Sequence, residues 1–294
     1  MPSVANNVHR NVCKTGRTYS MPDITALVRA TVLLTLLGFI QPGLAVSVEV
    51  AGRSLEIPAP AGFVDGAILP AEARELADSL TPATTRLLAF FVSVDDAERA
   101  KRGEELRWDR YMLAQVNRSS ESHDISPEAF FQIRTLYTEQ QKSLIANSPV
   151  DSDTLLLMLA QDADKGLRIG ESAPFGVFSE DEAHISMSAL TRHASTKRQR
   201  PSTYLVASGT NVVLTANKVL FTYVYTRFAS EVDLEWSERT SRDWTQAVIA
   251  ANPESTALGS VNWQRLFGGA LFGALIASVA LVAIALRRRR RSAG

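Results

Sequence analysis

Two uninterrupted hydrophobic stretches stand near the two ends of the chain. Residues 266–286 are 21 positions without a charged side chain, and about 20 apolar residues are enough to span the hydrocarbon core of a membrane. Residues 30–40 are apolar over only eleven positions, which is short for a membrane span and typical of a secretory signal. The pattern predicts an exported chain with one C-terminal transmembrane helix.

The N-terminal stretch also has the flanks of a signal peptide. Arg29 supplies a positive charge before it, and Gly43 and Ala45 place small residues at the −3 and −1 positions of a cleavage after Ala45. The alternative interpretation is an uncleaved N-terminal anchor. Residues 1–20 are polar and unpatterned, which suggests Met21 as the true start of the protein.

The charges around the C-terminal stretch predict its orientation. Residues 287–291 are five consecutive arginines, and Trp263 lies just before the stretch, where an indole ring favours the membrane interface. Because basic residues stay on the cytoplasmic side, we expect a single-pass protein of the bacterial inner membrane with its C-terminus in the cytoplasm. The expected division is a signal peptide (1–45), an extracytoplasmic domain (46–252), a linker (253–265), a transmembrane helix (266–286) and a basic tail (287–294).

Small residues recur at helical spacing within the predicted membrane span. Gly269, Gly273 and Ala277 lie four positions apart and therefore on one face of a helix. Such a face lets two helices approach closely in lipid. Self-association through these residues is one interpretation, and the high general frequency of glycine and alanine in membrane helices is the other.

The domain between the two stretches alternates between strand and helix patterns. Its apolar periodicity predicts an α+β fold in which a mainly antiparallel sheet packs with helices. Strands are expected at residues 46–57 (with a turn at Gly52), 86–94, 106–116, 175–179, 184–188, 204–208, 212–215 and 218–225, with turns at 180–182, Gly209 and Asn217. Helices are expected at residues 70–79, 127–147, 153–165 and 233–251.

Several of these elements carry a defined apolar face. Alternation in the last strand places Val219, Phe221, Tyr223 and Tyr225 on one side of the sheet. Helical spacing places Trp236, Thr240, Trp244, Val248 and Ala251 in one stripe of the last helix. The same spacing predicts that the helix beginning at Ser126–Pro127 buries Phe130, Ile133, Leu136 and Tyr137. These side chains are the expected core.

Charge and cysteine content narrow the possible functions. The chain is formally neutral, but residues 46–265 hold 22 Lys and Arg against 30 Asp and Glu. An acidic domain argues against nucleic acid as a partner. The single cysteine, Cys13, precedes the predicted cleavage site, so the mature domain has no disulfide, no thiolate nucleophile and no cysteine-ligated metal.

Segments 57–63 (Ile-Pro-Ala-Pro-Ala-Gly-Phe) and 217–225 (Asn-Lys-Val-Leu-Phe-Thr-Tyr-Val-Tyr) resemble a bacterial family of uncharacterised exported proteins. The Asp-Leu-Glu-Trp motif at 233–236, with Trp244 and the Asn-Trp pair before the membrane span, fits the same pattern. More loosely, the glycine–phenylalanine start, the late hydrophobic strand and the closing tryptophan-containing helix resemble a PsbP-like sandwich. The resemblance implies a fold and no activity.

One basic stretch stands out in the acidic domain. Arg192, Lys197, Arg198 and Arg200 precede a predicted strand, and we expect them in an exposed loop. They are candidates for contact with anionic lipid or with an acidic partner near the membrane. The alternative is an ordinary solvated loop.

Catalytic and cofactor motifs are not recognisable. His123, His184 and His193 lie outside any metal-binding spacing and are expected at the surface or in loops, and no serine has the flanking glycines of a nucleophile elbow. The sequence therefore predicts no cofactor and favours a tethered domain that binds or scaffolds a membrane-proximal partner. A tethered envelope enzyme such as a hydrolase is the alternative, and it would require a cleft with convergent polar groups and perturbed pKa values.

Overall fold

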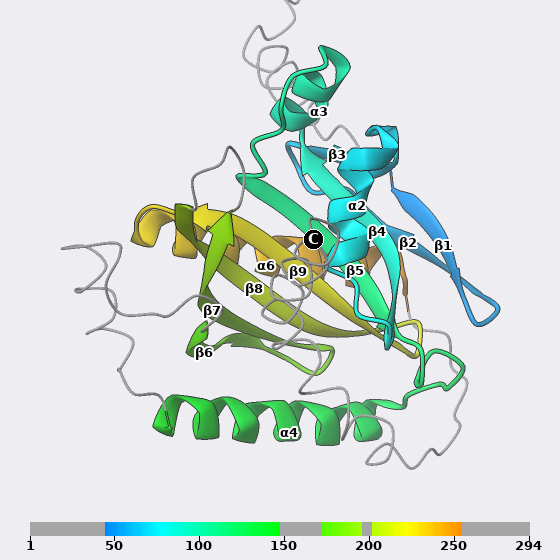
Figure 1. The fold of residues 1–294 in the computed structure, drawn as a ribbon. Helices are drawn as coiled ribbons and strands as arrows, with labels where there is room; N and C mark the ends of the chain where they lie inside the picture. The colour runs from blue at the N-terminus through cyan, green and yellow to red at the C-terminus, as the bar shows by residue number, and fades with distance from the viewer. Residues whose placement is uncertain (1–44, 148–171, 196–201, 254–294) are drawn as a thin grey trace, which may run out of the picture. The chain divides into compact units, whose positions relative to one another are not determined.

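The computed structural model describes residues 45–147, 172–195 and 202–253. They form an α+β fold around a seven-stranded antiparallel sheet with the strand order β3-β4-β5-β9-β8-β7-β6 (Figure 1). The strands are β3 (Phe63–Asp65), β4 (Thr85–Ser93), β5 (Arg110–Asn117), β6 (Ser172–Glu180), β7 (His184–Ser195), β8 (Ser202–Thr215) and β9 (Lys218–Phe228). The predicted α+β class with a mainly antiparallel sheet is confirmed.

A separate hairpin of two strands precedes this sheet. It consists of β1 (Val46–Val50) and β2 (Arg53–Ile57), paired antiparallel. Ala51 and Gly52 form the turn with positive φ angles of 49° and 81°, a backbone region that glycine adopts without strain. The expected hairpin around Gly52 is therefore confirmed.

Helices cover both faces of the main sheet (Figure 1). On one face, α6 (Glu231–Ala251) buries Trp244 and Val248 against Leu220 and Val224 of β9. On the other face, α4 (Pro127–Ala146) joins a second cluster that contains the predicted β9 side chains Val219, Phe221, Tyr223 and Tyr225. The remaining helical segments are η1 (Gly66–Ile68), α2 (Ala71–Ser79) and α3 (Val94–Lys101).

The start of α4 follows directly from its sequence. Ser126 caps the helix by accepting a hydrogen bond from the Ala129 amide, and Pro127 occupies the first turn, where no amide proton is needed. Phe130, Ile133 and Tyr137 are buried as predicted, whereas Leu136 is only half-buried.

One prediction is wrong in the second half of the sheet. Residues 204–208 and 212–215 do not form two strands with a turn at Gly209, because β8 runs without a break through that position. Gly209 pairs with Ser188 and Val224 on its two sides. A Cβ atom there would lie 2.0 Å from Oγ of Ser241 on α6, so glycine permits the close approach of a helix rather than a turn. The predicted turn at Asn217 is confirmed, with a φ of 60°.

The apolar stripe of α6 is also narrower than predicted. Trp244 and Val248 are buried, Trp236 and Thr240 are half-buried, and Ala251 is exposed. Asn252 caps the C-terminal end of the helix, and its side chain both donates to the Glu56 carbonyl and accepts from the Glu56 amide at 2.7 Å. This exchange fixes the end of α6 to β2.

Several predicted segments lie outside the described residues. They are the signal peptide (1–45) apart from Ala45, the helix at 153–165, the linker beyond Pro253, the transmembrane helix (266–286) and the basic tail (287–294). Within the residues that are described, no helix has the length and hydrophobicity that a membrane span requires.

Candidate functional site

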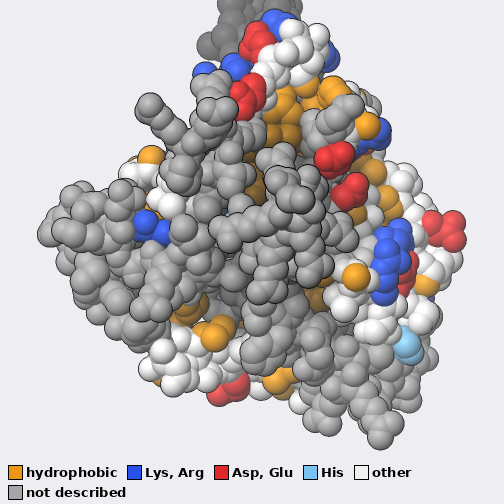
Figure 2. Space-filling model, viewed as in Figure 1, with side chains coloured by type: hydrophobic (Ala, Val, Ile, Leu, Met, Phe, Trp, Pro, Cys, Tyr) orange, Lys and Arg blue, Asp and Glu red, His pale blue; other side chains and the backbone are white. Residues whose placement is uncertain are grey.

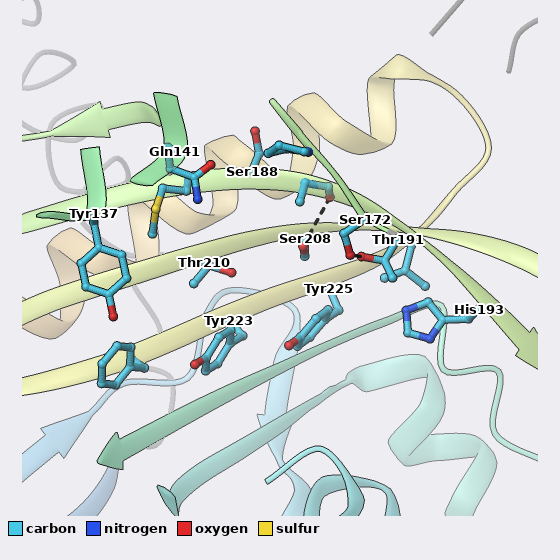
Figure 3. Close-up of a pocket in the computed structure, with 15 residues that line it drawn as sticks. Tyr137, Gln141, Ser172, Ser188, Thr191, His193, Ser208, Thr210, Tyr223 and Tyr225 are labelled. Atoms are coloured by element: carbon cyan, nitrogen blue, oxygen red, sulfur yellow. Dashed lines mark hydrogen bonds between the residues drawn. The ribbon is translucent and has the colours of Figure 1, made fainter. Parts of the chain in front are cut away.

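A narrow pocket lies between α4 and the face of the sheet formed by β6 to β9 (Figure 3). Its volume is about 40 Å³, which is enough for a few water molecules. The lining consists of Tyr137 and Gln141 of α4, with Ser172, Pro174, Met187, Ser188, Ala189, Thr191, His193, Val206, Ser208, Thr210, Phe221, Tyr223 and Tyr225 of the four strands. Strand alternation places most of these side chains on one face.

The described lining of this pocket carries no Lys, Arg, Asp or Glu. Burial raises the pKa of Tyr137 and of Tyr223 far above their ordinary range, so both phenols stay protonated at neutral pH. Burial lowers the pKa of His193, which favours the neutral imidazole. The described lining of the pocket is therefore uncharged near pH 7.

Hydroxyl and amide groups supply the polarity of the pocket. The Ser172 and Thr191 hydroxyls form a hydrogen bond of 2.7 Å, and Ser208 Oγ donates to the Ala189 carbonyl at 3.3 Å (Figure 3). Gln141 is 4% exposed, and its Oε1 atom has no hydrogen-bond partner. A buried carbonyl oxygen without a donor is costly, and Gln141 Oε1 is the unpaired acceptor among the described lining residues.

Aromatic rings form the opposite wall. Tyr223 and Tyr225 lie 6.1 Å apart with an interplanar angle of 12°, and Tyr225 stacks on Tyr111 at 4.9 Å. His193 stacks on Tyr204 at 5.6 Å. The described lining thus offers flat apolar surfaces on one side and neutral hydrogen-bonding groups on the other. This arrangement is suited to binding, and these residues include no carboxylate for acid–base chemistry.

A second polar arrangement lies at the β6–β7 hairpin. Ser179 Oγ is 3.0 Å from His184 Nε2, and His184 Nδ1 is 2.8 Å from Asp181 Oδ1. The order serine, imidazole, carboxylate is that of a hydrolytic triad. The Nδ1–Oδ1 pair is close, but Nδ1 makes no aligned hydrogen bond, and a hydrogen bond weakens steeply as its angle departs from linear.

Asp181 has an evident structural role in the same hairpin. Its Oδ1 atom accepts hydrogen bonds from the amides of Ala183 and His184 at 2.8 and 2.9 Å, which is an Asx-type turn. Burial acts to raise the pKa of Asp181, but these amides, the neighbouring His184 and Gln246 together hold the pKa below its ordinary value. The predicted turn at 180–182 is thus confirmed.

The structure changes the positions expected for several sequence candidates. Arg192 is not in an exposed loop: β7 extends to Ser195, and Arg192 is 5% exposed. His184 is 3% exposed rather than at the surface, and His193 is half-buried in the pocket. Lys197, Arg198 and Arg200 lie outside the described residues, as do Gly269, Gly273 and Ala277.

Larger but more open hollows lie along the domain surface. One, of about 400 Å³, is bordered by Pro60, Phe63, Arg110 and Trp236, with the Arg110 guanidinium 4.1 Å from the Trp236 ring centroid. On the face drawn in Figure 2, acidic and basic side chains lie close together, and the described side chains show no broad patch of one sign. No cluster of three possible metal ligands occurs among the residues placed in the structure.

No family model matches the chain, and no curated protein matches it. Solved structures of Mog1 are similar, namely the Saccharomyces cerevisiae Ran-binding protein Mog1p and a point mutant of Mog1. Each has 12% identity and a TM-score of 0.29, over 71% of this chain and 94% of the other. A TM-score that low supports no conclusion about fold or function.

Proposed function

We propose that the chain is a membrane-anchored binding protein whose domain, residues 46–252, lies on the outer side of a bacterial inner membrane. The observation that carries the binding role is the pocket of Figure 3, whose described lining is uncharged and combines aromatic surfaces with hydrogen-bonding groups. The anchor is supported by the uncharged stretch 266–286 and the arginines that follow it.

The arrangement of layers supports a finer proposal for the fold. Helices α4 and α6 pack on opposite faces of one antiparallel sheet, which is compatible with the PsbP-like sandwich. Contact with anionic lipid remains a proposal for Lys197, Arg198 and Arg200. Arg192 is left out because its side chain is buried.

The topology is tested with fusions and with N-terminal sequencing. A reporter that is active only in the cytoplasm, fused after Gly294, should be active, and the mature chain extracted from membranes should begin at Val46. Activity of an export-dependent reporter at Gly294 would reverse the orientation. A chain that begins at Met1 or Met21 would contradict the cleavage.

A tethered hydrolase is the second candidate, favoured by the Ser179–His184–Asp181 arrangement. Against it, His184 is 3% exposed and Asp181 already caps the turn. A fluorophosphonate probe labels activated serines, so labelling of the full chain that is lost in Ser179→Ala and retained in Ser172→Ala would establish the hydrolase. Equal labelling of both variants, or none of the parent chain, excludes this serine.

A further inference from the structure

We infer that the pocket between α4 and strands β6 to β9 takes a small uncharged ligand group that carries a hydrogen-bond donor, such as a hydroxyl or a carboxamide. The inference rests on the proposed binding function and names the ligand chemistry of that same pocket. Three properties of the described residues lead to it: the absence of charge in the lining, one unpaired acceptor, and the size of the space.

Charge is the first property. A charged group that enters the pocket leaves water and meets no countercharge among the described lining residues. Burying an ion without a partner is far more costly than burying a neutral polar group. The neutral state of His193, whose pKa is lowered by burial, leaves the described lining without a cation near pH 7. The lining therefore selects against carboxylates and ammonium groups.

The unpaired acceptor is the second property. Gln141 Oε1 is buried and has no donor, whereas the Ser172 and Thr191 hydroxyls are already hydrogen-bonded to each other. Gln141 extends from α4 toward the strands (Figure 3). A ligand N–H or O–H that reaches this oxygen relieves the cost of its desolvation, and an isosteric ligand without a donor does not.

Size is the third property. A volume of about 40 Å³ is well below the roughly 150 Å³ of a cavity that takes benzene. The space admits a few heavy atoms beside the Tyr223 ring, and the remainder of a larger ligand would stay outside. The group that enters is consequently small.

Three compounds of nearly the same shape separate these properties. Acetamide is neutral and has a donor, acetone is neutral without a donor, and acetate is anionic without a donor. The full chain in detergent micelles, labelled with ¹³C in its methionine methyl groups, provides the readout. Met187 lines the pocket, whereas Met112 is fully buried in the cluster on the opposite face of the sheet.

Acetamide should shift the Met187 methyl signal and leave Met112 unchanged. Acetate should need a concentration at least about tenfold higher, because an unpaired carboxylate is excluded. Acetone should fall between the two. Gln141→Leu should remove the advantage of acetamide over acetone, whereas the matched change Gln132→Leu, on the exposed side of the same helix, should leave it intact.

Other results overturn the inference. If acetate shifts Met187 as readily as acetamide does, the pocket does not select neutral groups. If Gln141→Leu leaves the preference intact, or if none of the compounds shifts Met187, the pocket is only a hydrated hollow. None of these outcomes affects the reporter fusions, so failure of the ligand assignment and failure of the anchored topology are distinguishable.

Discussion

Asp124 joins two cations that are far apart in the sequence. It accepts a hydrogen bond of 2.6 Å from Arg53 of β2 and lies 3.0 Å from Nζ of Lys218 on β9. The Lys218 side chain is 3% exposed, and its ammonium also donates to the carbonyls of Glu121 and His123. This buried ammonium group is therefore fully hydrogen-bonded, and Asp124 is its only carboxylate partner among the described residues.

The cluster predicts a loss of stability in acid. Burial acts to raise the pKa of Asp124, but hydrogen bonds from Arg53 and Lys218 outweigh it, so the pKa lies below its ordinary value. A carboxyl group with a lowered folded-state pKa stabilises the fold above its unfolded pKa of about 3.9, and the contribution is lost as pH falls through the folded pKa. Asp124→Asn should cost about 1–2 kcal/mol at pH 7 because Lys218 loses its countercharge.

Urea unfolding at pH 7 and at pH 3 tests this prediction. The Asp124→Asn variant should approach the parent stability as pH falls, since protonation removes the same interaction from the parent. A constant difference between the two proteins across this range would mean that Asp124 does not act through its charge.

Trp244 is the residue on which the packing of α6 depends most. It is 2% exposed, lies edge-on to Phe91 at 5.7 Å and donates from Nε1 to the Pro58 carbonyl at 2.9 Å. Trp244→Ala should therefore destabilise the domain by roughly 3–5 kcal/mol, through lost burial and a cavity. Trp236→Ala on the same helix should cost roughly 1–2 kcal/mol because that ring is half-buried.

Chemical unfolding followed by far-ultraviolet circular dichroism measures both changes independently of tryptophan fluorescence. A cost below about 1 kcal/mol for Trp244→Ala is incompatible with the burial of this ring. Equal costs for the two substitutions would contradict the assignment of Trp244 as the main anchor of the helix.

At the level of elements, α6 approaches the sheet through small residues. Ser237, Ser241 and Thr245 are fully buried, and the space above Gly209 is filled by Ser241. The Ser241 and Thr245 hydroxyls have no hydrogen-bond partner. The helix is therefore positioned by close backbone approach in its middle and by large apolar side chains farther along.

Gly209→Ala should separate α6 from β8. The added Cβ would lie 2.0 Å from Ser241 Oγ, 3.1 Å from Ser241 Cβ and 3.3 Å from the Ser237 carbonyl oxygen. The Ser241 hydroxyl must therefore rotate away and the helix must move outward by a few tenths of an ångström, at a cost of about 1–3 kcal/mol. Ser241→Ala alone should be nearly neutral because its hydroxyl has no partner. In the double variant, part of the lost stability should be recovered. A double-mutant cycle of unfolding free energies measures this recovery. Strict additivity would show that the two residues do not collide.

The sequence predicted elements where local signals were strong. The cap at Ser126, the turn at Asn217 and the alternation of β9 each depend on a few neighbouring residues, and each is confirmed. Gly209 was misassigned as a turn because its role comes from Ser241, which lies 32 positions later in the chain. A contact between distant elements leaves no local pattern.

The candidate site was harder to predict for the same reason. Gln141 belongs to a helix, whereas Thr191, His193 and Tyr223 belong to strands, and only the fold brings them together. The alternation of residues 187–193 would have placed Thr191 and His193 on one face. The sequence prediction made β7 too short. Arg192 and His193 are polar and therefore suggest a loop, because the sequence does not show that a helix covers this part of the sheet.

For the whole molecule, the linker limits how far the domain can extend from the membrane. If residues 266–286 span the bilayer, residues 253–265 connect it to the end of α6. Thirteen residues reach at most roughly 45 Å when fully extended. In that case the pocket would stay within this reach of the bilayer, and two domains whose anchors associate would share a limited volume.

The last prediction concerns that association. Gly269, Gly273 and Ala277 would share one face of the membrane helix, where the absence of bulky side chains permits close backbone contact. Because lipid provides no hydrophobic drive between helices, such contact is the main source of attraction. Gly273→Ile should weaken self-association and leave insertion intact, since isoleucine is well tolerated in hydrocarbon. Crosslinking in native membranes measures this. Equal crosslinking of parent and variant, or none in either, would mean that the helix serves only as an anchor.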